Sequence, residues 1–112
     1  MITNTADLMK TFLIDRTDGT PYGLIGKTLE LCLSPYPGAP STESVLCTTD
    51  NNMLRAIDDR TLGWTIPVDT MKTLVARMYH FDLIEVLSRS PNSFNPICSA
   101  DVRISPGTTG AA

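Results

Sequence analysis

The sequence has few of the groups on which catalysis depends. It contains one histidine, His80, and no glycine-rich loop that would hold a phosphate in front of a helix. A nucleophilic triad needs a base beside a serine or a cysteine, and His80 stands in a strand-like segment between two aromatic residues. We expect His80 to be a partly exposed or hydrogen-bonded strand residue, with a role as base for Cys98 or Ser99 as the alternative. We predict no enzymatic activity and no cofactor.

Positive charge and long apolar runs are also scarce. Nine Lys and Arg residues are scattered among 12 Asp and Glu residues, which gives a net charge of −3. Binding to a phosphate backbone needs clustered basic residues, so we expect no nucleic-acid partner. No apolar run approaches the ~18 residues of a membrane span, and residues 1–7 lack the basic start of a secretory signal. We expect no membrane partner and synthesis in a cytoplasm.

The cysteine pattern does not indicate a metal site. Cys32, Cys47 and Cys98 are odd in number, lie far apart and form no C-x-x-C pair. Each falls in an apolar strand-like run, where a free thiol usually behaves as a small buried hydrophobic group. A disulfide between Cys32 and Cys47 is the alternative, although a cytosolic origin disfavours it.

Three aspartates could supply oxygen ligands to calcium or magnesium, because hard cations prefer carboxylates. They are Asp50, Asp58 and Asp59. Their spacing does not match a D-x-D-x-D-G loop, and acidic residues in turns commonly bind nearby backbone amides. We therefore interpret them as turn residues and predict no bound metal.

What the sequence does contain is a regular alternation of apolar and polar residues between turns. The 112 residues are 42% hydrophobic, which suits one domain, and eight prolines and seven glycines divide them at intervals too short for long helices. The alternation is clearest at residues 27–34, where Leu29, Leu31 and Leu33 share one face. Trp64, in a similar run, is a predicted core anchor.

This pattern predicts an all-β fold: an antiparallel β-sandwich of about seven short strands with one short helical turn. The helical turn follows Pro67 and carries Met71 and Leu74 on one face. We expect an N-terminal arm at residues 1–10, a sandwich domain at 11–106 and a flexible tail at 107–112. Predicted strands are residues 11–16, 27–34, 43–49, 53–57, 62–66, 75–87 and 97–105, with a loop at 88–96.

The order of several short motifs resembles that of a known family. The motifs are DGTP at residues 18–21, LGWTIP at 62–67 before the short helix, YHFDL at 79–83 and DVRISP at 101–106. The succession resembles small immunoglobulin-like proteins of phages and prophages, and is similar to the N-terminal domain of siphophage upper baseplate proteins. It covers residues 11–106, and it departs from the family in the proline-rich loop at 35–40 and at Ala100, where many such sequences have glycine.

The resemblance implies an immunoglobulin-like sandwich in a virion component assembled in the host cytoplasm. The expected function is structural, through contacts with other phage structural proteins and with copies of itself, most consistent with a tail, baseplate or fibre-attachment adaptor. A capsid decoration (cement) protein is the alternative. A carbohydrate-binding host-attachment module is a further alternative, which the 6% aromatic content disfavours.

Candidate protein-contact residues come from the stiff loop at 35–40, from the polar segment at 88–96 and from the two ends of the chain. Phe94 is either tucked back or exposed for binding, and the sequence leaves both alternatives open. The six candidates are Tyr36, Pro37, Phe94, Ile2, Leu8 and Pro106.

Overall fold

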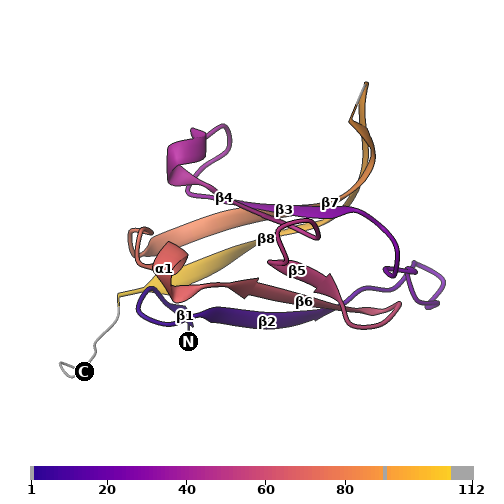
Figure 1. Cartoon of the computed structure of the whole chain (residues 1–112), viewed down its shortest axis with the longest axis horizontal. Helices are drawn as coiled ribbons and strands as arrows, with labels where there is room; N and C mark the ends of the chain where they lie inside the picture. Colours follow the sequence, from indigo (N-terminus) through magenta and orange to yellow (C-terminus); the bar gives the residue numbers. More distant parts are fainter. Residues whose placement is uncertain (1, 90, 107–112) are drawn as a thin grey trace.

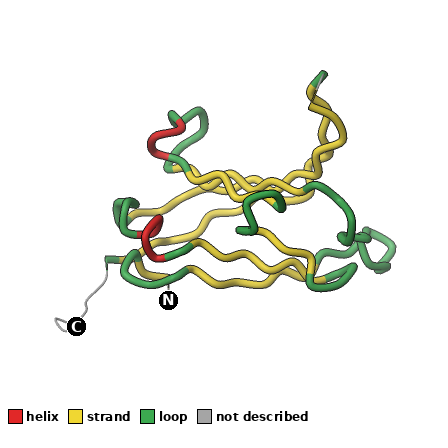
Figure 2. The backbone as a smooth tube through the Cα atoms, viewed as in Figure 1, coloured by secondary structure: helices red, strands yellow, loops and turns green. Residues whose placement is uncertain are grey.

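The computed structural model describes residues 2–89 and 91–106, and it consists mostly of β-strands arranged in two sheets (Figure 1). The larger sheet has the order β1-β8-β7-β3-β4, and the smaller has the order β2-β6-β5. Figure 2 shows the two layers of strands with loops at both ends. The strands are β1 (Ile2–Thr3), β2 (Leu8–Leu13), β3 (Leu29–Ser34), β4 (Val45–Thr48), β5 (Leu54–Ala56), β6 (Thr61–Ile66), β7 (Arg77–Arg89) and β8 (Asn92–Ser105).

The predicted alternation is confirmed where it was strongest. Leu29, Leu31 and Leu33 of β3 are all fully buried, and β3 pairs antiparallel with both β4 and β7. The DGTP motif at residues 18–21 lies in a turn, where Gly19 adopts a φ of +87° that a side chain would disfavour. One face of β3 therefore lies on the core between the sheets.

Trp64 of β6 lies at the centre of that core and is fully buried. Its ring is 5.7 Å from the ring centroid of Phe12 and 5.3 Å from that of Phe81, so it joins β2 of the smaller sheet to β7 of the larger one. The indole Nε1–H donates to Sγ of Cys47 at 3.2 Å, which satisfies the one polar group of the ring. The prediction of Trp64 as a core anchor is confirmed.

Two short helical segments cap one end of the sandwich. The first, η1 (Ser41–Glu43), precedes β4, and the second, α1 (Val68–Met71), follows Pro67. Met71 and Leu74, which were predicted to share one face, are both buried. No helix in the described part of the chain is long and apolar enough to cross a membrane.

The first ten residues do not form a separate arm. Leu8 is 1% exposed and begins β2, which pairs with β6 from Leu8 opposite Ile66 onward. Ile2 of β1 pairs in parallel with Ile104, so the larger sheet is mixed and not wholly antiparallel. The start of β2 at Leu8 was not predicted, because the exposed Lys10 interrupts the apolar face that Leu8 begins. The predicted tail at 107–112 lies outside the described residues.

The prediction of a loop at residues 88–96 is wrong, because most of this segment belongs to β7 and β8. β7 and β8 pair as one long antiparallel hairpin from Arg77 opposite Ile104 to Arg89 opposite Asn92. Register shifts after Leu83 and after Val86 interrupt the ladder and accommodate Pro96. Pairing with β7 thus outweighs the low strand propensity of the Ser, Asn and Pro residues in this segment.

The three cysteines are free and differ in exposure. Cys47 is buried, Cys32 is half-buried and Cys98 is exposed. Cys98 lies opposite the buried Leu83 and so on the core side of the sheet, but the prediction that it is buried is wrong, because β8 lies near the edge of its sheet. Cys32 pairs with Leu46 while Cys47 pairs with Leu31, so the two thiols lie on opposite faces of the sheet and form no disulfide.

Replacing Trp64 by alanine tests the central position of this ring. We expect Trp64→Ala to lower the free energy of unfolding by about 3–5 kcal/mol, because it removes the contacts that join the sheets and leaves a cavity. The matched control is Leu13→Ala, which truncates a side chain that is 75% exposed and should change stability by less than about 0.5 kcal/mol. Equal losses in urea unfolding of the two variants would contradict this account.

Candidate protein-contact surfaces

Large exposed apolar side chains are concentrated in a few places on the molecule. Two lie on the outer face of the smaller sheet, two on the outer face of the larger sheet and two on the β7–β8 hairpin, and the others lie in loops. Such groups mark contact surfaces when they form a patch. They are Met9, Leu13, Ile25, Tyr36, Leu46, Ile57, Val75, Met78, Leu87 and Phe94.

The distal hairpin, which we define as residues 86–89 of β7 and 92–95 of β8, projects from the sandwich (Figures 1 and 2). Pairing of β7 with β3 ends at Glu85 opposite Leu29, so the distal hairpin is a two-stranded ribbon. Leu87 is 52% exposed and Phe94 is 55% exposed on it. Phe94 is therefore exposed, which resolves the alternative that the sequence left open. A two-stranded ribbon is marginally stable by itself, so contact with a partner would stabilise it.

Ionic contacts tie the distal hairpin to the sandwich near its tip, through Arg89, and at its base, through Glu85. Nη2 of Arg89 lies 2.7 Å from Oε2 of Glu30 in β3 and 3.7 Å from Oδ2 of Asp50. At the base of the hairpin, Glu85 accepts a hydrogen bond from the Tyr22 hydroxyl at 2.8 Å and contacts Nζ of Lys27 at 3.3 Å. Burial alone would raise the pKa of the Glu85 carboxyl, but these hydrogen bonds outweigh it and lower the pKa. The hairpin thus leaves the sandwich in a defined direction.

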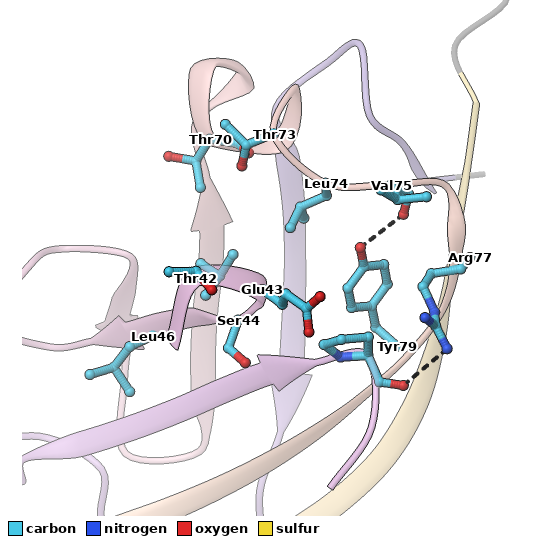
Figure 3. Close-up of a pocket in the computed structure, with 12 residues that line it drawn as sticks. Thr42, Glu43, Ser44, Leu46, Thr70, Thr73, Leu74, Val75, Arg77 and Tyr79 are labelled. Atoms are coloured by element: carbon cyan, nitrogen blue, oxygen red, sulfur yellow. Dashed lines mark hydrogen bonds between the residues drawn. The ribbon is translucent and has the colours of Figure 1, made fainter. Parts of the chain in front are cut away.

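A pocket of about 370 Å³ opens at the other end of the sandwich, between η1, the segment after α1 and the start of β7 (Figure 3). The Tyr79 hydroxyl donates to the Val75 carbonyl at 2.8 Å, and Arg77 Nη2 donates to the Pro35 carbonyl at 3.4 Å. Burial is the main cause of the raised pKa of Tyr79. The wall combines the exposed Val75 with charged Glu43 and Arg77, so the pocket could receive a side chain or loop of a partner.

His80 lies on the outer face of the larger sheet between two carboxylates. Its Nδ1 is 3.0 Å from Oδ1 of Asp101 on β8, and its Nε2 is 3.3 Å from Oδ1 of Asp82. The hydrogen bond to Asp101 is the main cause of the raised pKa of His80, burial opposes it less strongly, and the Asp82 contact adds to the rise. No hydrogen bond links His80 to Cys98 or Ser99 in the described chain. The prediction of a hydrogen-bonded strand histidine is confirmed.

Two of the aspartates considered as metal ligands have other contacts, Asp50 with Arg89 and Asp58 within its turn. Oδ1 of Asp58 accepts hydrogen bonds from the backbone N–H groups of Arg60 at 2.9 Å and Thr61 at 2.7 Å. These bonds lower the pKa of Asp58. Across residues 2–89 and 91–106, no group of three or more His, Cys, Asp or Glu side chains is arranged to hold a metal ion.

The six predicted contact residues lie in separate places. Tyr36, which is 45% exposed and donates to Glu43 at 2.9 Å, and the exposed Pro37 lie near the pocket. Half-buried Ile2 and exposed Pro106 lie near the end of β8 that β1 covers, whereas Phe94 lies on the distal hairpin. Leu8 is a buried core residue, so its prediction as a contact is wrong.

Sequence reasoning missed Leu87 of the distal hairpin and Met9 and Leu13 of β2. Leu87 stood in a predicted strand with apolar residues on both faces, which is the signal that could have identified it. Met9 and Leu13 alternate with Leu8 and Phe12, and they become recognisable as exposed only once β2 is placed beside β6.

Comparison with known proteins adds no relative to this picture. No protein-family model matches the chain, and no curated protein matches it. The contact surfaces are therefore argued from their own geometry.

An NMR titration of His80 tests whether Asp101 and Asp82 raise its pKa. We expect the pKa of His80 to lie above its ordinary value of 6.5 and to fall in Asp101→Asn more than in Asp82→Asn, because the Asp101 contact has the larger effect. The stabilisation that protonated His80 contributes is fully present below pH 6.5 and is lost as the pH rises through the raised pKa. An unchanged pKa in Asp101→Asn would refute the assignment.

Proposed function

We propose that the protein is a non-enzymatic structural subunit of a bacteriophage particle, with an immunoglobulin-like sandwich that positions contact surfaces for other virion proteins. Its place is a tail, baseplate or fibre-attachment adaptor. The motif resemblance over residues 11–106 supports the phage assignment, and the two-sheet all-β fold agrees with it. Since one fold hosts many functions, the contact surfaces and not the fold support the role itself.

The distal hairpin is the observation that carries this proposal. It extends a pair of strands beyond the core, is tied back to β3 by the ion pair between Arg89 near its tip and Glu30, and exposes Leu87 and Phe94 where they have little core to pack against. An exposed aromatic residue on a defined projection suits insertion into a partner, since aromatic anchors dominate protein interfaces. An adaptor needs an element that contacts a partner in addition to its own folded core, and we assign that role to the distal hairpin.

The alternative of a carbohydrate-binding module needs aromatic side chains that form an exposed platform. Phe12, Trp64 and Phe81 instead pack on one another inside the sandwich. The two large exposed aromatics, Tyr36 and Phe94, belong to a loop after β3 and to the distal hairpin. This distribution favours protein contacts over sugar stacking.

Quantitative mass spectrometry of purified particles tests the proposal. We expect the protein in particles and in isolated tails, at a few to a few dozen copies per particle. Hundreds of copies confined to the shell would instead support the capsid decoration alternative. Absence of the protein from purified particles would refute a virion role altogether.

Changing the two apolar residues of the distal hairpin tests its role in attachment. We expect Leu87→Ser combined with Phe94→Ser to reduce incorporation into particles about tenfold or more, as loss of an interface anchor does. The thermal midpoint should stay near that of the wild type, because both side chains are exposed. Met9→Ser with Leu13→Ser, on the other sheet, is the matched control. If the two double variants are incorporated equally, the hairpin is not the attachment element.

A further inference from the structure

One edge of the larger sheet is long and largely open. β8 has 14 residues and pairs with β7 on one side, but on its other side β1 covers only Ile104 and Ser105. In the described chain no strand pairs with the rest of that side. The other sheet edges are shorter, since β4 has four residues, β5 three and β2 six. An open strand edge of this length is a template for pairing with another strand.

Two features limit the part of this edge that another strand could use. Pro96 lacks an N–H group and borders the register shift at Ile97, which lies between it and Cys98, so pairing with another strand can begin only after Pro96. At the opposite end, Ile2 of β1 already occupies the position beside Ile104. The usable segment, which we call the open edge, is residues 97–103.

Two side chains of the open edge lie on the core side of the sheet but remain exposed to solvent. Cys98 and Ala100 pair with the buried Leu83 and Phe81 and therefore point to the same side of the sheet, yet both are exposed. Beside them a groove of about 880 Å³ runs between β2 and β8, with Phe12 and Ile97 among its lining residues. A strand added to β8 would cover this side of the molecule.

We propose that the occupant of the open edge is the same edge of a second copy, in an antiparallel dimer with Ala100 opposite Ala100 of the partner subunit. This deepens the proposed structural function, on which it rests, by naming the partner of one surface. A two-fold axis places each residue pair twice, so the open edge must be complementary to itself. Centring on Ala100 is the register that uses all of residues 97–103 and no others.

Side-chain chemistry favours the same register. It places Ser99 opposite Asp101 of the partner subunit, where the hydroxyl can donate to the carboxylate, and it sets Cys98 against the partner's Val102. Small alanines meet at the axis. Moving the axis to Asp101 would oppose two carboxylates, which destabilises a strand pair. Moving it to Val102 would require the position beside Ile104 that β1 fills, and moving it to Ser99 would bring Pro96 into the ladder.

Cysteine cross-linking tests the dimer and its register. In a Cys32→Ser, Cys98→Ser background, Ala100→Cys should give a disulfide-linked dimer on mild oxidation, because directly opposed residues have Cα atoms about 4.5–5.5 Å apart. The remaining Cys47 is buried. The matched control is Arg103→Cys, whose two copies would lie roughly 20 Å apart along the strands. Cross-linking of Arg103→Cys and not Ala100→Cys would overturn the register.

Sedimentation of the otherwise unchanged chain supplies the second readout. We expect a concentration-dependent dimer that Ala100→Lys converts to monomer, because the two new charges face each other, while Met9→Lys, at an exposed position on the outer face of the smaller sheet, leaves the dimer intact. A dimer that persists in Ala100→Lys, or a wild-type monomer at every concentration together with no cross-linking, would overturn the proposal.

The dimer and the virion role can fail separately. A dimer in solution with no protein in particles would leave the edge pairing intact and refute the proposed function. Protein present in particles, with no cross-linking of Ala100→Cys either in solution or within them, would refute the dimer alone.

Discussion

The contact of Trp64 with rings from both sheets is the interaction on which the structure depends. A sandwich of this size has one core, and the aromatic residues Phe12, Trp64 and Phe81 fill its middle from three different strands. The hydrogen bond to Cys47 fixes the indole and keeps that thiol in apolar surroundings, where burial raises its pKa to about 11. Everything at the periphery, including the distal hairpin and the open edge, is held in place by sheets that this contact joins.

Strict alternation made the centre of the fold predictable from the sequence. The leucines of β3 and the run of Leu62, Trp64 and Ile66 in β6 are apolar at every second position, and all of them are buried. Such a pattern depends only on local geometry, because successive side chains of a strand point to opposite faces. The short helical turn after Pro67 was equally local and equally predictable.

The elements that the sequence did not reveal depend on pairing between distant segments. β1 has two residues and exists only because Ile104 and Ser105 lie beside it. The distal hairpin contains Ser, Asn and Pro residues that favour loops, yet β7 supplies a long template for β8. The same limit applies to the contact surfaces. Of the six predicted contacts, Phe94 belongs to the hairpin and Leu8 belongs to the core, and only the three-dimensional arrangement distinguishes the two.

The parallel pairing of β1 with the end of β8 has a consequence for how the molecule could be linked to others. It places residues 2 and 106 near each other, while β8 runs from there over roughly 40 Å to the tip of the distal hairpin. A tether or fused module joined directly before residue 2 or after residue 106 would therefore start from the same pole. Within one copy the distal hairpin lies at the opposite pole, and in the proposed antiparallel dimer each pole would carry the end of β8 beside β1 from one copy and the distal hairpin of the other.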